Sequence, residues 1–216
     1  MIVRVKICCI RDEAEAALAV RLGASALGLV SAMPSGPGPI PEEDIARIAR
    51  TVPPGIETFL LTSLSDPAAI ADQVRRCGTR VVQLVDRVPA GAHTLIRSTG
   101  VRVIQVIHVT GPESVEDAVR EAETADGLLL DSGNPGLAVK ELGGTGRTHD
   151  WSVSRRIVEQ VDKPVYLAGG LTPGNVAEAI RAVEPYGVDL CSGVRADGRL
   201  DPVKLQAFLE AVASCR

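Results

Sequence analysis

The most constraining feature of this chain is the alternation of short β-branched runs with helix-period segments, which repeats eight times in 216 residues. Parallel strands must be joined by long crossovers, usually helices, so this pattern favours a parallel sheet covered by helices. Aromatic residues make up only 2% of the chain, so Val, Leu, Ile and Ala must build the core, as is typical of buried parallel strands. The expected strands are Val3–Ile7, Ala26–Val30, Glu57–Leu61, Val81–Leu84, Val101–Ile107, Gly127–Leu130, Pro164–Ala168 and Gly187–Cys191. The expected helices are Arg11–Arg21, Glu42–Arg50, Pro67–Arg76, Ala92–Ser98, Glu113–Ala122, Ser152–Val161, Pro173–Val183 and Pro202–Ala213.

Several helix ends carry local signals. Gly23 follows the first helical segment and is a candidate for the residue in left-handed conformation that ends this helix. Asp66-Pro67, Thr172-Pro173 and Asp201-Pro202 each place a capping residue before a proline at the first helical position. These three pairs therefore predict helix starts.

The linkers between these segments are short, and the composition does not shift along the chain, so residues 1–216 are expected to form one domain. Eight right-handed crossovers close naturally into a single (β/α)8 TIM barrel of the α/β class. An open doubly wound sheet is the alternative. It is disfavoured because KICCIRDEAEA, rather than a glycine-rich dinucleotide turn, follows the first strand.

Composition excludes several classes of function. The formal net charge of −4 and only five aromatic residues argue against a nucleic-acid partner. The long uncharged stretch Leu22–Pro41 contains too many Gly and Pro residues for a membrane helix. The first ten residues lack a secretory signal, so a cytoplasmic location is expected. The five cysteines are widely spread, and their spacing predicts neither a disulfide framework nor a zinc site; no metal is expected.

In a barrel of this type, the active site lies where the strands end. Glycines cluster after the last three strands, where backbone N–H groups can approach an anion closely. A lone Gly-Gly pair is usually a turn, but its recurrence at this end of the barrel favours a phosphate site. The residues expected to bind substrate there are Gly143, Gly144, Gly146, Gly169, Gly170, Ser192 and Gly193.

Two side chains are candidates for acid–base chemistry. Asp131 ends the apolar run GLLLD, where partial desolvation favours its protonated form and so a general acid; a loop or capping carboxylate is the alternative. Cys8 shares a strand face with Lys6, and a nearby cation favours the thiolate, so Cys8 is a candidate base or nucleophile. A buried, inert cysteine is the alternative. His149, alone in a loop, is expected to be solvated or supporting.

Five ordered motifs resemble phosphoribosylanthranilate isomerase, a (β/α)8-barrel family of tryptophan biosynthesis. They are VKIC at Val5–Cys8, LLLDS at Leu128–Ser132, GGTGRTHDW at Gly143–Trp151, LAGGLTPGNVAEAI at Leu167–Ile180 and VDLCSGV at Val188–Val194. Together they span nearly the whole chain.

The resemblance implies an Amadori rearrangement of a phosphorylated pentose substrate, without cofactor or metal. On the matching positions, Asp131 is the general acid that opens the furanose ring and Cys8 the general base that removes the proton from sugar carbon 2. Asp189 matches a family aspartate near the ribose. The oligomeric state is left open between a monomer and a homodimer.

The chain departs from the family pattern where the anthranilate would bind. Gly38 stands where the family places an arginine for the anthranilate carboxylate, and Val85 follows Gln-Leu where the family has histidine. Cys9 replaces a glycine, and Arg195 replaces a glutamate. A relocated carboxylate clamp is therefore expected at Arg195, which could instead contact the phosphate, or at Arg147.

Two further functions stay open at this stage. The first is a paralogous isomerase that acts on another pentose phosphate derivative. The second is a noncatalytic phosphosugar-binding barrel, which is disfavoured because binding alone requires neither Cys8 nor Asp131.

Overall fold

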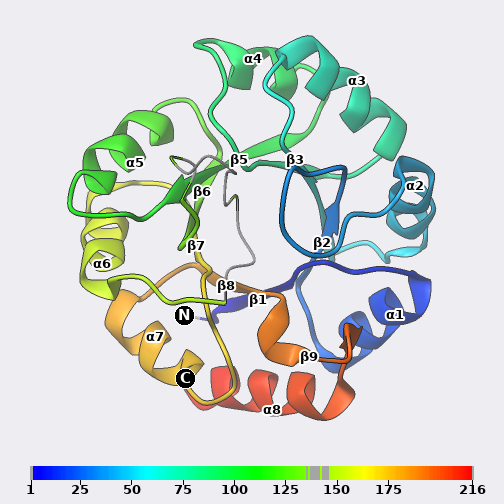
Figure 1. Cartoon of the computed structure of the whole chain (residues 1–216), viewed down its shortest axis with the longest axis vertical. Helices are drawn as coiled ribbons and strands as arrows, with labels where there is room; N and C mark the ends of the chain where they lie inside the picture. The colour runs from blue at the N-terminus through cyan, green and yellow to red at the C-terminus, as the bar shows by residue number, and fades with distance from the viewer. Residues whose placement is uncertain (1, 135, 137–141, 143–145, 216) are drawn as a thin grey trace.

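The computed structural model describes residues 2–134, 136, 142 and 146–215. Eight parallel strands pair in chain order, and β8 pairs with β1 to close a barrel. Figure 1 shows the helices as an outer ring around these strands. The strands are β1 (Arg4–Ile7), β2 (Ala26–Val30), β3 (Glu57–Thr62), β4 (Val81–Leu84), β5 (Arg102–His108), β6 (Gly127–Asp131), β7 (Val165–Leu167) and β8 (Gly187–Leu190). The helices are α1 (Glu13–Leu22), α2 (Glu42–Thr51), α3 (Pro67–Cys77), α4 (Ala92–Arg97), α5 (Ser114–Ala122), α6 (Trp151–Gln160), α7 (Val176–Val183) and α8 (Pro202–Ala213). The expected (β/α)8 barrel is confirmed.

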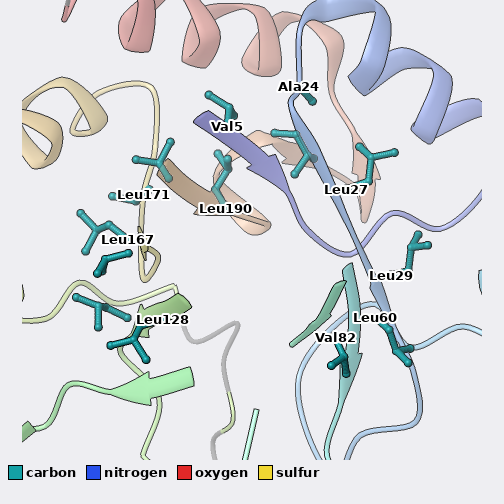
Figure 2. Packing of buried hydrophobic residues seen from close by; sticks show 14 of the residues in the cluster. Val5, Ala24, Leu27, Leu29, Leu60, Val82, Leu128, Leu167, Leu171 and Leu190 are labelled. Atoms are coloured by element: carbon teal, nitrogen blue, oxygen red, sulfur yellow. The ribbon is translucent and has the colours of Figure 1, made fainter. Parts of the chain in front are cut away.

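Alternate strand residues point to two different layers. On β1, Val5 and Ile7 belong to the apolar cluster between the strands and the helices, which we call the outer core. Figure 2 shows part of this cluster, with side chains such as Leu27, Leu60 and Leu128 on three different strands. The period of two along each strand therefore builds a continuous layer that fixes the helices on the barrel.

The other face of the strands fills the barrel interior, which includes Phe59, Tyr166 and the buried Lys6. The Phe59 and Tyr166 rings meet edge to face with centroids 5.7 Å apart. Lys6 Nζ lies 5.2 Å from the centroid of Phe59, within cation–π range. The interior is therefore packed with side chains and also holds charge.

Two of the three predicted helix starts are confirmed. Asp66 accepts hydrogen bonds from the Ala68 and Ala69 amides, and Asp201 caps α8 in the same way. The prediction at Thr172-Pro173 is wrong, because α7 begins at Val176. The Asn175 side chain accepts from the Thr172 amide at 2.8 Å and donates to the Gly170 carbonyl at 3.0 Å, which holds residues 172–175 as a turn.

A short hairpin after β8 was not among the expected elements. A 3-10 turn, η1 (Ser192–Val194), leads into β9 (Arg195–Ala196) and β10 (Arg199–Leu200). The hairpin turns at Asp197 and Gly198, both with positive φ, and an Asp-Gly pair is a typical hairpin turn. No helix in the described part of the chain is both long and apolar enough to cross a membrane.

Candidate active site

A pocket of about 740 Å³, including space open to solvent, lies where the strands end. It brings together the ends of β1, β2, β6, β7 and β8, which are far apart in sequence. Of the predicted site residues, the following line it: Cys8, Asp131, Gly146, Gly169, Gly170, Asp189 and Ser192.

Cys8 directly follows β1, and its amide donates to the Leu190 carbonyl at 2.8 Å. Its thiol lies over Gly28: a Cβ on Gly28 would be 2.9 Å from Cys8 Sγ and 3.1 Å from Lys6 Nζ. The absence of a side chain at Gly28 therefore leaves room for both groups. The closeness of Cys8 and Lys6 that strand alternation predicts is confirmed.

Lys6 forms a buried ion pair with Asp189, with 2.8 Å between Nζ and Oδ1. Burial favours the neutral amine, but the carboxylate of Asp189 outweighs it and raises the pKa of Lys6 above its usual value. The lysine therefore stays charged. The parallel register of β1 on β8 creates the pair by placing Lys6 opposite Asp189.

Asp131 is the last residue of β6 and is buried. Burial raises the pKa of its carboxyl, while the hydrogen bond from the Ser132 amide and the nearby His108 act in the opposite direction. A carboxyl group whose protonated form is favoured can donate a proton. The desolvation expected at the end of GLLLD is confirmed, and Asp131 is suited to act as an acid.

Two glycines after β7 are held close to the loop before α6. Gly169 and Gly170 have φ of 84° and 61°, and a Cβ on Gly170 would lie 2.7 Å from the Arg147 carbonyl carbon and 2.8 Å from the Thr148 nitrogen. Ser132 Oγ donates to the Arg147 carbonyl at 2.5 Å on the same side. Backbone packing therefore leaves no room for a side chain at Gly170. The same packing holds the loop after β7 against the loop before α6 at the pocket wall.

Three other predicted phosphate residues have different outcomes. Gly193 is not among the residues that line the pocket; a Cβ there would lie 2.1 Å from the Leu171 carbonyl oxygen, so it serves loop packing. Gly143 and Gly144 lie outside the described residues.

The predicted contact of Arg195 with substrate is not supported, because Arg195 is not among the residues that line this pocket. Its guanidinium binds the Glu15 carboxylate and the backbone carbonyls of Cys8 and Cys9. The physical reason is the buried carboxylate of Glu15, which pairs with the guanidinium. Arg147, the other expected clamp, lines a separate groove beside Ser132 and His149.

The departures at Cys9 and Gly38 turn out to be one local feature. A Cβ on Gly38 would lie 2.5 Å from the Cys9 Cβ, so the two positions cannot both carry a side chain in this backbone. Hydrogen bonding with Cys191 and Cys8, together with burial, raises the pKa of the Cys9 thiol well above its usual value. Cys9 therefore stays protonated and is unsuited to act as a base.

His149 lies next to Gly169 at the candidate site. Its Nε2 is 2.7 Å from Ser154 Oγ, and a Cβ on Gly169 would lie 3.2 Å from its Nδ1. Burial lowers the pKa of this histidine to about 4, so the ring is neutral. The expectation that His149 supports rather than reacts agrees with this placement.

The sequence interpretation missed the Lys6–Asp189 and Arg195–Glu15 pairs, whose partners are 183 and 180 positions apart. The only available signal was the uncommon placement of Lys6 inside an apolar strand. Among the described residues, no group of three or more His, Cys, Asp or Glu is arranged to hold a metal ion.

The family model and the similar curated proteins give the same family. The family described as PRAI, N-(5'phosphoribosyl)anthranilate (PRA) isomerase, matches residues 5–211. The N-(5'-phosphoribosyl)anthranilate isomerase of Haloferax volcanii is 40% identical over 215 residues, covering 99% of this chain and 94% of the relative.

Two solved structures extend the likeness to the fold. The phosphoribosyl anthranilate isomerase of Thermus thermophilus aligns with a TM-score of 0.84 and 30% identity, covering 99% of this chain and all of that one. A phosphoribosyl anthranilate isomerase in complex with reduced 1-(o-carboxyphenylamino)-1-deoxyribulose 5-phosphate aligns with a TM-score of 0.82 and 30% identity over 98% of this chain and 99% of that one. The chain belongs to the N-(5'-phosphoribosyl)anthranilate isomerase family.

Proposed function

We propose that this chain isomerises N-(5'-phosphoribosyl)anthranilate by an Amadori rearrangement in tryptophan biosynthesis, with Asp131 as general acid and Cys8 as general base. The observation that carries the proposal is that a buried carboxyl and a buried thiol line one pocket at the ends of β6 and β1. Family membership supplies the substrate, a phosphorylated pentose. No cofactor enters the reaction as proposed.

The proposed reaction has three proton-transfer steps. Asp131 donates its proton to the furanose ring oxygen while the bond from that oxygen to sugar carbon 1 breaks, and the anthranilate nitrogen lone pair forms a Schiff base. The Cys8 thiolate then removes the proton from sugar carbon 2, and the electron pair returns to the nitrogen through a carbon 1–carbon 2 double bond. Transfer of the hydroxyl proton at carbon 2 to carbon 1 gives the ketose.

The raised pKa of Asp131 supports the first step, because its acid form persists above the usual range of a carboxyl. Lys6 is placed to support the second step, since the space over Gly28 brings its charged ammonium next to Cys8 Sγ. Asp189, held by Lys6, is the proposed acceptor for a ribose hydroxyl.

The phosphate is proposed to lie against Gly146, Gly169, Gly170 and Ser192, where positive-φ glycines expose backbone N–H groups. Binding the phosphate there would orient the sugar between acid and base and so lower the entropy cost of reaction. The opposite wall, with Met33, Pro37 and Val85, is apolar and is proposed to contact the aromatic ring.

The carboxylate of anthranilate leads to a second candidate function. No lysine or arginine is among the described residues that line the pocket, and an unpaired buried carboxylate is costly. This observation favours, as the alternative, a paralogous isomerase whose aglycone lacks a carboxylate. Residues 1–216 are proposed to act as one domain, as a monomer or a homodimer.

The test is a direct assay with phosphoribosylanthranilate, whose fluorescence is lost as it is consumed. We expect turnover by the purified chain without added metal or cofactor, and turnover lower by about 10²-fold or more in the Cys8→Ser variant. No consumption at any enzyme concentration would contradict the anthranilate assignment and favour the paralogue.

The proposed phosphate site has its own test. A crystal grown in sulfate should hold the anion between Gly170 and Ser192.

A further inference from the structure

A buried ion pair lies directly behind the backbone of Cys8. Arg195 Nη1 and Nη2 lie 3.2 and 3.1 Å from Glu15 Oε1 and Oε2, and the two side chains are 10% and 6% exposed. Arg195 begins β9 and Glu15 lies in the first turn of α1, so the pair joins segments 180 positions apart. A two-bond guanidinium–carboxylate contact is both strong and directional.

Glu15 is itself held on several sides. Its Oε1 accepts from the Leu200 amide at 3.0 Å, and its Oε2 accepts from the Arg11 amide at 3.2 Å. Its own amide donates to Asp12 Oδ1 at 2.9 Å. The carboxylate therefore ties the hairpin after β8 to the loop between β1 and α1, and it gives Arg195 a fixed anchor.

From that anchor, Arg195 reaches the backbone at the candidate base. Its Nη2 donates to the Cys9 carbonyl at 2.5 Å and lies 3.3 Å from the Cys8 carbonyl. Cys9 has a φ of 61°, the left-handed conformation that non-glycine residues avoid, so the chain bends sharply after Cys8. A charged donor on the two carbonyls stabilises this bend, and the bend fixes the direction of the Cys8 side chain.

We propose that Arg195, anchored by Glu15, is a positioning residue for Cys8: it holds the Cys8 and Cys9 carbonyls and so directs the thiol into the pocket. Arg195 is not among the residues that line the pocket, so in this role it acts through the Cys8 and Cys9 backbone rather than by contact with the substrate. The role rests on the proposed function of Cys8 as the base.

The main test compares Arg195→Met with a matched control, Arg199→Met. Arg199 lies on the same hairpin and pairs with Asp12 at the start of α1, at 2.7 Å, but this pair is exposed and does not touch Cys8 or Cys9. We expect Arg195→Met to lower kcat by about 10²-fold, because a small misplacement of a reacting group has that effect. The KM should change by less than about threefold, since uniform substrate binding is kept. Arg199→Met should retain the wild-type kcat.

A second readout needs no substrate. Alkylation by iodoacetamide is followed by mass spectrometry of the tryptic peptide Ile7–Arg11, and fragmentation of this peptide separates the label on Cys8 from the label on Cys9. The rate of Cys8 labelling reports the exposure and ionisation of its thiol. We expect the alkylation rate of Cys8 to change in Arg195→Met and to stay unchanged in Arg199→Met. Arg195→Lys should give an intermediate kcat. An ammonium can pair with Glu15, but it lacks the planar set of donors that lets the guanidinium also bind the Cys8 and Cys9 carbonyls.

Arg195→Met leaves Glu15 buried and unpaired, which could unfold the protein. The double variant Glu15→Gln/Arg195→Met removes that charge, and circular dichroism checks its fold. Wild-type kcat and an unchanged Cys8 alkylation rate in either folded Arg195 variant would overturn the proposal. A loss of activity that appears only as a higher KM, with kcat unchanged, would also overturn the proposal. If the wild-type chain does not consume phosphoribosylanthranilate, the proposed function fails, and the alkylation rates still decide the role of Arg195.

Discussion

The outer core and the barrel interior are built on alternate residues of the same strands, yet they differ in chemistry. The outer core is a continuous layer of aliphatic side chains with Phe208 and Cys77. The interior buries Lys6, Asp131 and Asp189 among apolar residues at the end of the barrel where the pocket opens. Burying charge is costly unless it is paired, so an interior of this kind is explained by chemistry rather than by stability.

The comparison predicts a separation of effects. Substitutions in the outer core should change the free energy of unfolding and leave the rate per folded molecule unchanged. Substitutions of the pocket groups Cys8 and Asp131, which form no ion pair with another described residue, should change the rate and cost little stability.

Cys8→Ser should show the largest effect on rate. A hydroxyl is a much weaker base than a thiolate at neutral pH, so kcat should fall by about 10²-fold or more. The melting temperature should change by less than about 4 °C, as expected for about 1 kcal/mol or less. Steady-state kinetics and calorimetry measure the two quantities.

Cys77→Ser is the matched control, because Cys77 is fully buried in the outer core at the end of α3. The same substitution there should lower the melting temperature and leave kcat unchanged. Near-normal turnover by Cys8→Ser would contradict its role as base. A large loss of kcat in folded Cys77→Ser would break the separation between the two layers.

Asp131→Asn should lower kcat by about 10²-fold, because the amide keeps the shape of the side chain but has no proton to donate. Calorimetry with a product analogue should show that phosphate-dependent binding is kept. Equal losses of binding and turnover would mean that Asp131 is structural.

The same variant tests stability. The pKa of Asp131 is raised in the folded state, so the folded protein binds this proton more tightly than the unfolded chain does. Stability from this group is therefore present below the unfolded pKa and is lost as pH rises through the folded pKa. Asp131→Asn should remove this loss, so its advantage in melting temperature over the wild type should grow from pH 4 to pH 8. A constant difference across that range would contradict the raised pKa.

Gly38→Ala tests the contact with Cys9 at the pocket rim. The new Cβ would meet the Cys9 Cβ and also strain a φ of 89°, so we expect a loss of about 2–4 kcal/mol from the two causes. Gly55→Ala is the control, since Gly55 has a φ of 95° but no atom within 4 Å of the added Cβ. In a Cys9→Gly background, the excess cost at position 38 over position 55 should shrink, because only the 3.1 Å contact with the Cα at position 9 remains. Urea denaturation measures this coupling, and an unchanged excess would contradict the contact.

The acid sensitivity of His149 should be the smallest effect. Its pKa is about 4 in the folded protein against an ordinary 6.5, so its contribution to stability is present above pH 6.5 and is lost as pH falls to 4. The loss should be at most about 3 kcal/mol, from 1.36 kcal/mol per pKa unit. His149→Gln should flatten this part of the stability curve, measured by denaturation between pH 4 and pH 7. An unchanged slope would show that His149 is not buried as neutral imidazole.

The sequence by itself determined the barrel and the ends of its strands. A period of two within each strand and the helices between them admit few other arrangements, and these are local properties of the chain. Because a barrel places its chemistry at the strand ends, Cys8 and Asp131 followed as candidates without any coordinates.

Only the tertiary structure decided which groups pair and which glycines pack. Closure of β8 onto β1 brings Asp189 to Lys6 and the following hairpin to Glu15, so Arg195 lies behind Cys8 and not in the pocket. Gly170 owes its lack of a side chain to the backbone at Arg147. These contacts join residues that are distant in sequence, and no local pattern encodes them, because the energy of a buried charge depends on the partner that folding brings to it.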